Sequence, residues 1–199
     1  MGSVEVMVNT AGARLGAEAA RRLAAIGRVQ FGPPMTDADF TRVHDGFGFE
    51  LAEDHRAFLA AGLPEGAGWP NWRDADSASV RASLRWPVEG VLFDVSNNAF
   101  WHDDWGPRPA SGVTAVEVAR EALGAAPQMV PVFGHRYLPA GGGTFGHPVM
   151  SIYQSDVICY GTDLVDYVHQ EFGAGPGVDR GDERWRPRPT VTFWSDLIG

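Results

Sequence analysis

The chain has 199 residues and a formal net charge of −9, from 16 basic and 25 acidic side chains, with one cysteine, Cys159. This length fits one large domain, and 44% apolar residues can build a core without the intrachain disulfide that a lone cysteine cannot form. The acidic balance argues against a nucleic-acid partner, because phosphate binding needs a basic face. All 16 basic residues are arginines, which excludes mechanisms that need a lysine amine.

The sequence shows no membrane-spanning or targeting pattern. No stretch reaches 18 uninterrupted apolar residues. The N-terminus lacks the basic-then-apolar pattern of a signal peptide, since Glu5 and Asn9 interrupt it. We therefore expect no membrane partner and a cytoplasmic location.

Three helices are predicted in the first third of the chain. Apolar residues share one stripe over 14–26, which predicts an amphipathic helix. Thr36 and Asp39 form a capping pair that opens a second helix, closed by Gly46. Acidic residues in a first turn and a following glycine predict a third helix over 52–61.

The middle of the chain predicts two helices and a strand. Asp76 can cap a helix, and the apolar run at 88–95 is typical of a mostly buried strand. Thr114 and Glu117 have the spacing of a capping box for a helix that ends at Gly124.

The last third predicts strands around one helix. Strands are expected at 129–138, 149–153 and 157–160, a helix from Thr162 to Phe172, and a short strand at 190–194. Helices first, and then strands interleaved with helices, indicate a single α+β domain with helices packed around a mixed or antiparallel sheet.

Acidic side chains are concentrated in residues 32–66, which contain seven acidic residues and two arginines. One interpretation is a solvated helical face; the other is a docking face for a basic partner. The candidate docking residues are Asp37, Asp39, Glu50, Glu53 and Asp54.

Two polar segments are candidates for a ligand or partner pocket, and each also has a purely structural interpretation. The candidate residues are Trp101, His102, Asp103, Trp105, His135, Arg136 and Tyr137. A histidine beside carboxylates can act in acid–base chemistry, but the first segment can equally be a turn anchored by tryptophans. Strand alternation places His135 and Tyr137 on one face of a sheet and Arg136 on the other.

No catalytic or metal-binding pattern emerges. Ser151, His135 and Asp156 supply the residue types of a nucleophilic triad, but no Gly-x-Ser-x-Gly elbow surrounds the serine. The six histidines lack the spacing of metal-ligand pairs. We expect no catalytic residues, no metal and no cofactor.

The order of motifs from residue 47 onward resembles the SUKH superfamily, which comprises a fungal cell-wall assembly regulator and many bacterial toxin-immunity proteins. The run FELAEDHRAFL at 49–59 resembles its helix motif, although Ala52 stands where the superfamily often has proline. The further blocks are GWPNW at 68–72, GVLFDV at 90–95, FWH at 100–102, WGPRP at 105–109, PVFGHRY at 131–137, and residues 148–161.

The resemblance implies an α+β domain that works by binding, without shared catalytic residues. It divides the chain into an N-terminal helical extension (1–35), a SUKH-like domain (36–172) and an Arg/Pro-rich C-terminal tail with a short strand (173–199).

Three functional hypotheses follow. The first is a non-enzymatic, immunity-type protein that binds and neutralises a basic toxin. The second is an enzyme or small-ligand-binding protein that uses the Trp/His/Arg/Tyr-lined pocket. The third is a regulatory scaffold.

Overall fold

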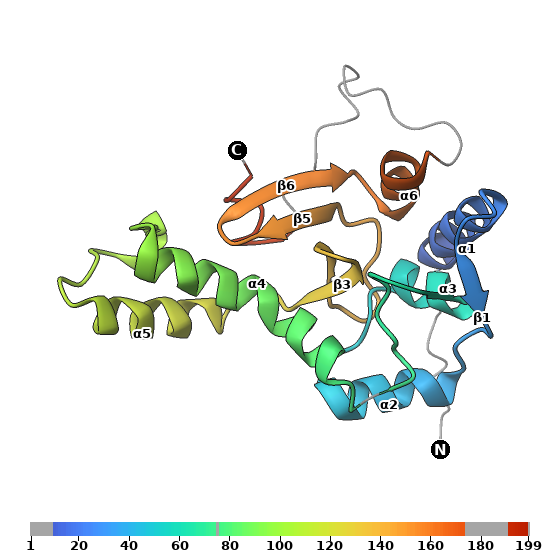
Figure 1. Ribbon diagram of the computed structural model, residues 1–199, viewed down its shortest axis with the longest axis horizontal. Helices are drawn as coiled ribbons and strands as arrows, with labels where there is room; N and C mark the ends of the chain where they lie inside the picture. Colours follow the sequence, from blue (N-terminus) through green and yellow to red (C-terminus); the bar gives the residue numbers. More distant parts are fainter. Residues whose placement is uncertain (1–9, 75, 174–190, 199) are drawn as a thin grey trace.

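The computed structural model describes residues 10–74, 76–173 and 191–198, and it confirms the α+β class (Figure 1). The helices are α1 (Thr10–Ala25), α2 (Asp37–Phe47), α3 (Glu53–Ala61), α4 (Ala78–Asn97), the 3₁₀ helix η1 (Asp103–Trp105), α5 (Gly112–Leu123) and α6 (Leu164–Phe172). The strands are β1 (Gln30–Gly32), β2 (Leu63–Glu65), β3 (Met129–Phe133), β4 (Arg136–Pro139), β5 (Val149–Tyr153) and β6 (Asp156–Gly161). β1 pairs with β2, and the other four form an antiparallel meander in chain order.

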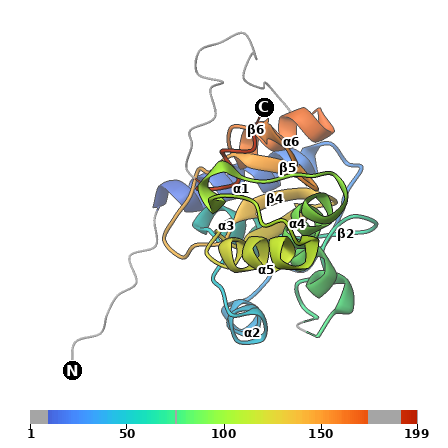
Figure 2. The same cartoon turned by 90° about the vertical axis from the view of Figure 1, so that its left-hand side faces the viewer.

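The four-stranded sheet lies between two helical layers (Figure 2). Alternate strand residues feed two separate cores. Val130 and Leu138 pack with residues of α1, α2, α3 and α6, whereas Met129 and Tyr137 pack with residues of α4 and α5. Because both faces of the central strands are covered, β3 is buried along nearly its whole length, whereas buried and exposed residues alternate at the start of β6.

Helix α1 crosses α3 at very short range and belongs to the first core. A Cβ at Gly16 would lie 2.0 Å from the backbone oxygen of Asp54, so a side chain there has no room. Ala19 and Leu23, one turn and two turns further on, are fully buried. The predicted amphipathic helix therefore supplies one wall of the domain.

The predicted start of α2 is confirmed. Thr36 and Asp39 form a reciprocal capping box, and the backbone N–H of Thr36 is the main reason why the pKa of Asp39 is lowered. The helix ends at Phe47 rather than at Gly46, because Gly48 adopts the left-handed conformation that closes it.

The predicted strand at 88–95 is wrong: these residues continue α4. Val88, Val91 and Val95 recur at helical spacing and pack into the second core. A short, apolar, valine-rich run is typical of a buried strand, but here both the run and Pro87 before it lie inside the helix.

Two other element boundaries differ from the prediction. The cap of α5 is Ser111, whose side chain accepts from the N–H of Thr114, so the predicted box with Glu117 does not form. The predicted strand at 129–138 is a hairpin, because Gly134 takes a left-handed φ of 53° and turns the chain.

Helix caps also differ at α4 and α6. Ser77, not Asp76, caps α4, and Asp163, not Thr162, caps α6. Gly173 ends α6, as predicted, in the left-handed conformation.

The predicted strand at 190–194 is not formed in the described residues. Residues 191–198 fold into successive turns, joined to the sheet by an isolated bridge between Ile198 and Val157. The remainder of the predicted Arg/Pro-rich tail, 174–190, lies outside the described residues. None of the described helices has the length and apolarity to cross a bilayer.

Pro87 removes one backbone hydrogen bond from α4, and a side chain of the sheet replaces it. Its missing N–H leaves the carbonyl of Ser83, four residues earlier, without the usual helical donor. The hydroxyl of Tyr137 on β4 donates to that carbonyl at 3.1 Å. Burial of the same hydroxyl raises the pKa of Tyr137.

We predict that Tyr137→Phe lowers the free energy of unfolding by about 1–2 kcal/mol, because it leaves the Ser83 carbonyl without a donor. In a Pro87→Ala background the alanine N–H can take over, so the same substitution should cost less than about half as much. Urea denaturation of the four proteins of this cycle measures the coupling. Tyr153→Phe, at an exposed tyrosine, is the control; equal costs of Tyr137→Phe in both backgrounds would contradict the interpretation.

A candidate docking site: an acidic groove between α2 and α3

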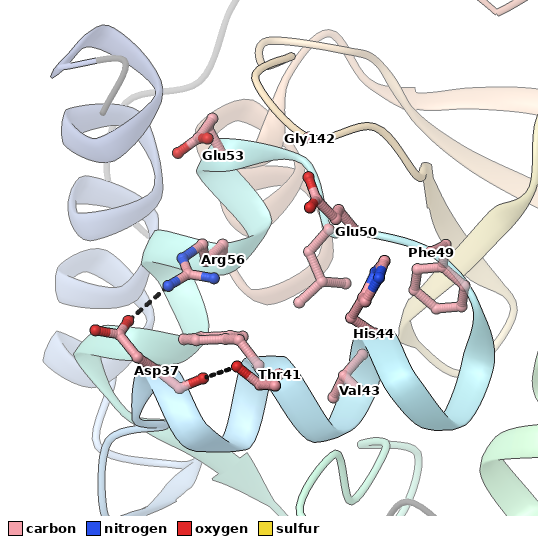
Figure 3. Close-up of a pocket in the computed structure, with 11 residues that line it drawn as sticks. Asp37, Thr41, Val43, His44, Phe49, Glu50, Glu53, Arg56 and Gly142 are labelled. Atoms are coloured by element: carbon pink, nitrogen blue, oxygen red, sulfur yellow. Dashed lines mark hydrogen bonds and ion pairs between the residues drawn. The ribbon is translucent and has the colours of Figure 1, made fainter. Parts of the chain in front are cut away.

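A groove of about 480 Å³ lies between α2, α3 and the loop after β4 (Figure 3). Phe40, Val43 and Leu51 are buried core residues that form its apolar floor. The other lining residues are Asp37, Thr41, His44, Phe49, Glu50, Glu53, Arg56 and Gly142. An apolar floor with a charged rim suits a protein segment that combines an apolar side chain with charged neighbours.

The rim of the groove carries excess negative charge. Asp37 pairs with Arg56 at 2.6 Å, and the guanidinium of Arg56 also lies 4.2 Å from the ring centre of Phe40. Glu50 and Glu53 have no ion-pair partner among the described residues. Two carboxylates are therefore available to an incoming cation.

Backbone hydrogen bonds fix the main chain at both glutamates. The N–H of Glu53 donates to the carbonyl of Thr144 at 2.7 Å, and the N–H of Gly141 donates to the carbonyl of Glu50 at 2.9 Å. A Cβ at Gly142 would lie 1.8 Å from Oε2 of Glu50. The glycine-rich loop thus allows Glu50 to lie directly against the backbone.

Only part of the predicted acidic docking face is at the surface. Asp37, Glu50 and Glu53 line the groove. Asp39 is 5% exposed and is used by the α2 cap and by an ion pair with Arg42. Asp54 is fully buried and accepts from the N–H groups of His55 and Gly146 at 3.0 and 2.9 Å. Internal hydrogen bonds therefore remove both carboxylates from the docking face.

The first of the two predicted polar segments, at residues 101–105, forms an aromatic cluster at the C-terminal end of α4. The indole of Trp101 donates to the carbonyl of Gly106 at 2.7 Å, as expected for an anchored turn. The ring of His102 packs against Trp105 and Phe193, with ring centres 5.7 and 5.2 Å apart. Asp103 is exposed at the first position of η1.

The hairpin residues follow strand alternation and separate. His135 and Tyr137 line a small hollow of about 300 Å³ with Trp86 of α4. Arg136 points to the other face, where it pairs with Glu171 at 2.9 Å and donates to Ser151 at 3.0 Å.

The seven predicted pocket residues therefore lie in three different surroundings. The structure does not bring them together around one cavity, because adjacent strand residues face opposite layers of the fold. The Ser151 hydroxyl has Arg136 as its partner, and Cys159 is a buried core residue.

Sequence reasoning missed the groove itself. Phe40 and Val43 are buried on the inner side of α2, but their role as the floor of an open groove depends on the distant Gly142 loop. The signal present in the sequence was the local excess of acids; it does not distinguish Glu50 and Glu53 from the internally used Asp39 and Asp54.

His55, next to the groove on α3, is buried without a partner for Nδ1 in the described structure. Burial lowers the pKa of His55 to about 3 and raises that of Asp54 to about 6. Neutral His55 therefore stabilises the fold fully above its unfolded pKa of about 6.5, and this contribution is lost as the pH falls towards 3. Asp54 acts in the opposite direction, since its contribution is lost as the pH rises from about 4 through 6.

We predict that the free energy of unfolding of His55→Phe, which keeps a ring beside Trp72, increases by about 3 kcal/mol relative to that of the unmodified protein as the pH falls from 7.5 to 4.5. The difference between the two proteins isolates His55, because the Asp54 contribution is common to both. Urea unfolding across this range measures it, and parallel stability curves would contradict the assignment.

Comparisons of the chain with protein-family models, with curated proteins and with solved structures gave no match.

Proposed function

We propose that this chain is a non-enzymatic, cytoplasmic protein-binding module of the immunity type, which binds a basic toxin through the groove between α2 and α3. The observation that carries the proposal is the pair of unpaired carboxylates, Glu50 and Glu53, beside an apolar floor. The motif resemblance to toxin-immunity proteins supports the same class of function.

The chemistry of the groove defines what the partner should offer. An arginine or lysine can pair with Glu50 and Glu53, while an apolar neighbour packs against Phe40 and Leu51. Arg56 is already paired with Asp37, so it adds little repulsion towards an incoming cation. The net charge of −9 accelerates encounter with a basic protein.

A second candidate function is the binding of a small aromatic ligand in the hollow beside Trp86. Trp86 is 45% exposed and Tyr153 is 55% exposed, with ring centres 6.1 Å apart. His135 packs against the same Tyr153 at 6.4 Å. Exposed rings around a hollow are a common feature of ligand sites, so Trp86→Ala tests this surface separately from the groove.

If a neighbouring gene encodes a basic toxin domain, we predict that Glu50→Gln/Glu53→Gln weakens binding of that domain by about 10- to 100-fold, because two charge pairs are lost. Calorimetry at two salt concentrations measures affinity, and co-expression with the toxin measures protection of growth. Glu117→Gln/Glu121→Gln, at exposed positions of α5, makes the same charge change away from the groove and should leave both unchanged.

Other outcomes separate the hypotheses. Loss of binding in Trp86→Ala, with the groove variant unaffected, would favour the small-ligand or aromatic surface. A stable complex with a partner that is not a toxin would favour a regulatory scaffold. Absence of binding to any neighbouring gene product, with unchanged survival when the gene is deleted, would contradict the immunity proposal.

A further inference from the structure

A candidate metal site lies at the opposite end of the molecule from the docking groove. His102, Asp104 and Asp196 each offer one ligand atom, and these atoms all lie within 4.8 Å of one another. His102 and Asp104 belong to the loop around η1, whereas Asp196 belongs to the segment 191–198. The three side chains therefore come from parts of the chain that only the fold brings together.

The histidine is held in a form that can bind a metal. Its Nδ1 accepts a hydrogen bond from the backbone N–H of Asp104 at 3.3 Å and lies 4.0 Å from Oδ2 of that residue. A nitrogen that accepts a hydrogen bond carries a lone pair, and a bound metal ion would take that lone pair in place of the Asp104 N–H. Packing against Trp105 and Phe193 fixes the plane of the ring.

The segment that carries Asp196 is also anchored. The indole of Trp194 donates to the carbonyl of Pro127 at 2.9 Å, and the Trp194 side chain is 1% exposed. The N–H of Asp196 donates to the carbonyl of Phe193 at 3.1 Å. Asp104 and Asp196 themselves are exposed, so their side chains can rotate by the small amount that coordination requires.

We propose that His102, Asp104 and Asp196 bind one divalent transition-metal ion of the Zn²⁺ type, with water completing the coordination. One imidazole nitrogen and two carboxylate oxygens are ligands that Zn²⁺ accepts at about 2.0–2.2 Å, which places neighbouring ligand atoms about 3.3 Å apart. The distances between the ligand atoms, at most 4.8 Å, need to contract by up to about 1.5 Å, which rotation of the exposed aspartate side chains allows. No arginine pairs with Asp104 or Asp196 in the described residues, so the metal would neutralise otherwise uncompensated charge.

Such an ion has a structural consequence. It cross-links the loop after α4 to the segment 191–198, and so it stabilises the folded state according to its free concentration. The site is separate from Glu50 and Glu53, so it does not depend on the proposed docking function. The sequence predicted no metal because its histidines have no ligand spacing among themselves. His102 and Asp104 are close in the sequence, but their third partner, Asp196, is distant along the chain.

The test is a titration of the untagged, EDTA-treated full chain with ZnCl₂, followed by calorimetry and thermal unfolding, and with CoCl₂, followed by visible absorption. We expect one Zn²⁺ per chain and a rise in melting temperature of at least about 3 °C at saturation. His102→Phe keeps the aromatic packing, and Asp196→Asn keeps the shape of the side chain. Each should weaken Zn²⁺ binding at least 30-fold and reduce the Co²⁺ bands.

Asp103→Asn is the matched control, because it removes the same charge from the neighbouring residue outside the trio. It should bind Zn²⁺ like the unmodified protein. An equal loss in Asp103→Asn and Asp196→Asn would show only general attraction of cations to an acidic surface and would overturn the proposal. Unchanged binding in Asp196→Asn, or no binding in the unmodified chain, would overturn it as well.

Discussion

The attachment of α4 to the sheet determines how the rest of the second layer is arranged. Tyr137 donates to the carbonyl that Pro87 leaves free, and Asp94, two turns later, accepts from the N–H of Ser155 in the β5–β6 turn at 2.9 Å. Between these points, a Cβ at Gly90 would lie 2.9 Å from the Cα of Gln154, so the helix and the turn are in backbone contact. The helix is therefore fixed along its second half, and the direction in which it leads the chain towards α5 is fixed with it (Figure 1).

Hydrogen bonds inside the fold also divide the acidic residues of the first third of the chain into two groups. Asp39 and Asp54 are used inside the fold, one to cap α2 and the other to hold the loop at Gly146. The same loop hydrogen-bonds the backbone of Glu50 and Glu53 and not their carboxylates, so both carboxylates remain at the rim of the groove. Net charge at a surface thus depends on which carboxylates the backbone has already engaged.

Local chemistry made much of the fold predictable. The capping pair of α2 and the glycine that ends α6 were identified correctly because each depends on residues within one turn. The prediction for 88–95 was wrong because the β-branched content of the segment outweighed its helical spacing. In addition, the Tyr137 hydroxyl, which replaces the N–H that Pro87 lacks, is 54 positions in sequence from the Ser83 carbonyl that it binds. The candidate sites were less accessible for the same reason: Gly142 shapes the groove, and Asp196 joins His102, only after the chain has folded.

The segment 191–198 is part of the core even though little regular structure marks it. Val191 and Trp194 are each 1% exposed, and Trp194 closes a hollow between α4 and α5 that Leu84, Val88 and Leu123 also line. A shortened chain that stops before this segment would expose the apolar residues between α4 and α5 to solvent and would tend to self-associate. Expression boundaries and fusion partners for this protein should therefore be chosen so that Trp194 remains packed between α4 and α5.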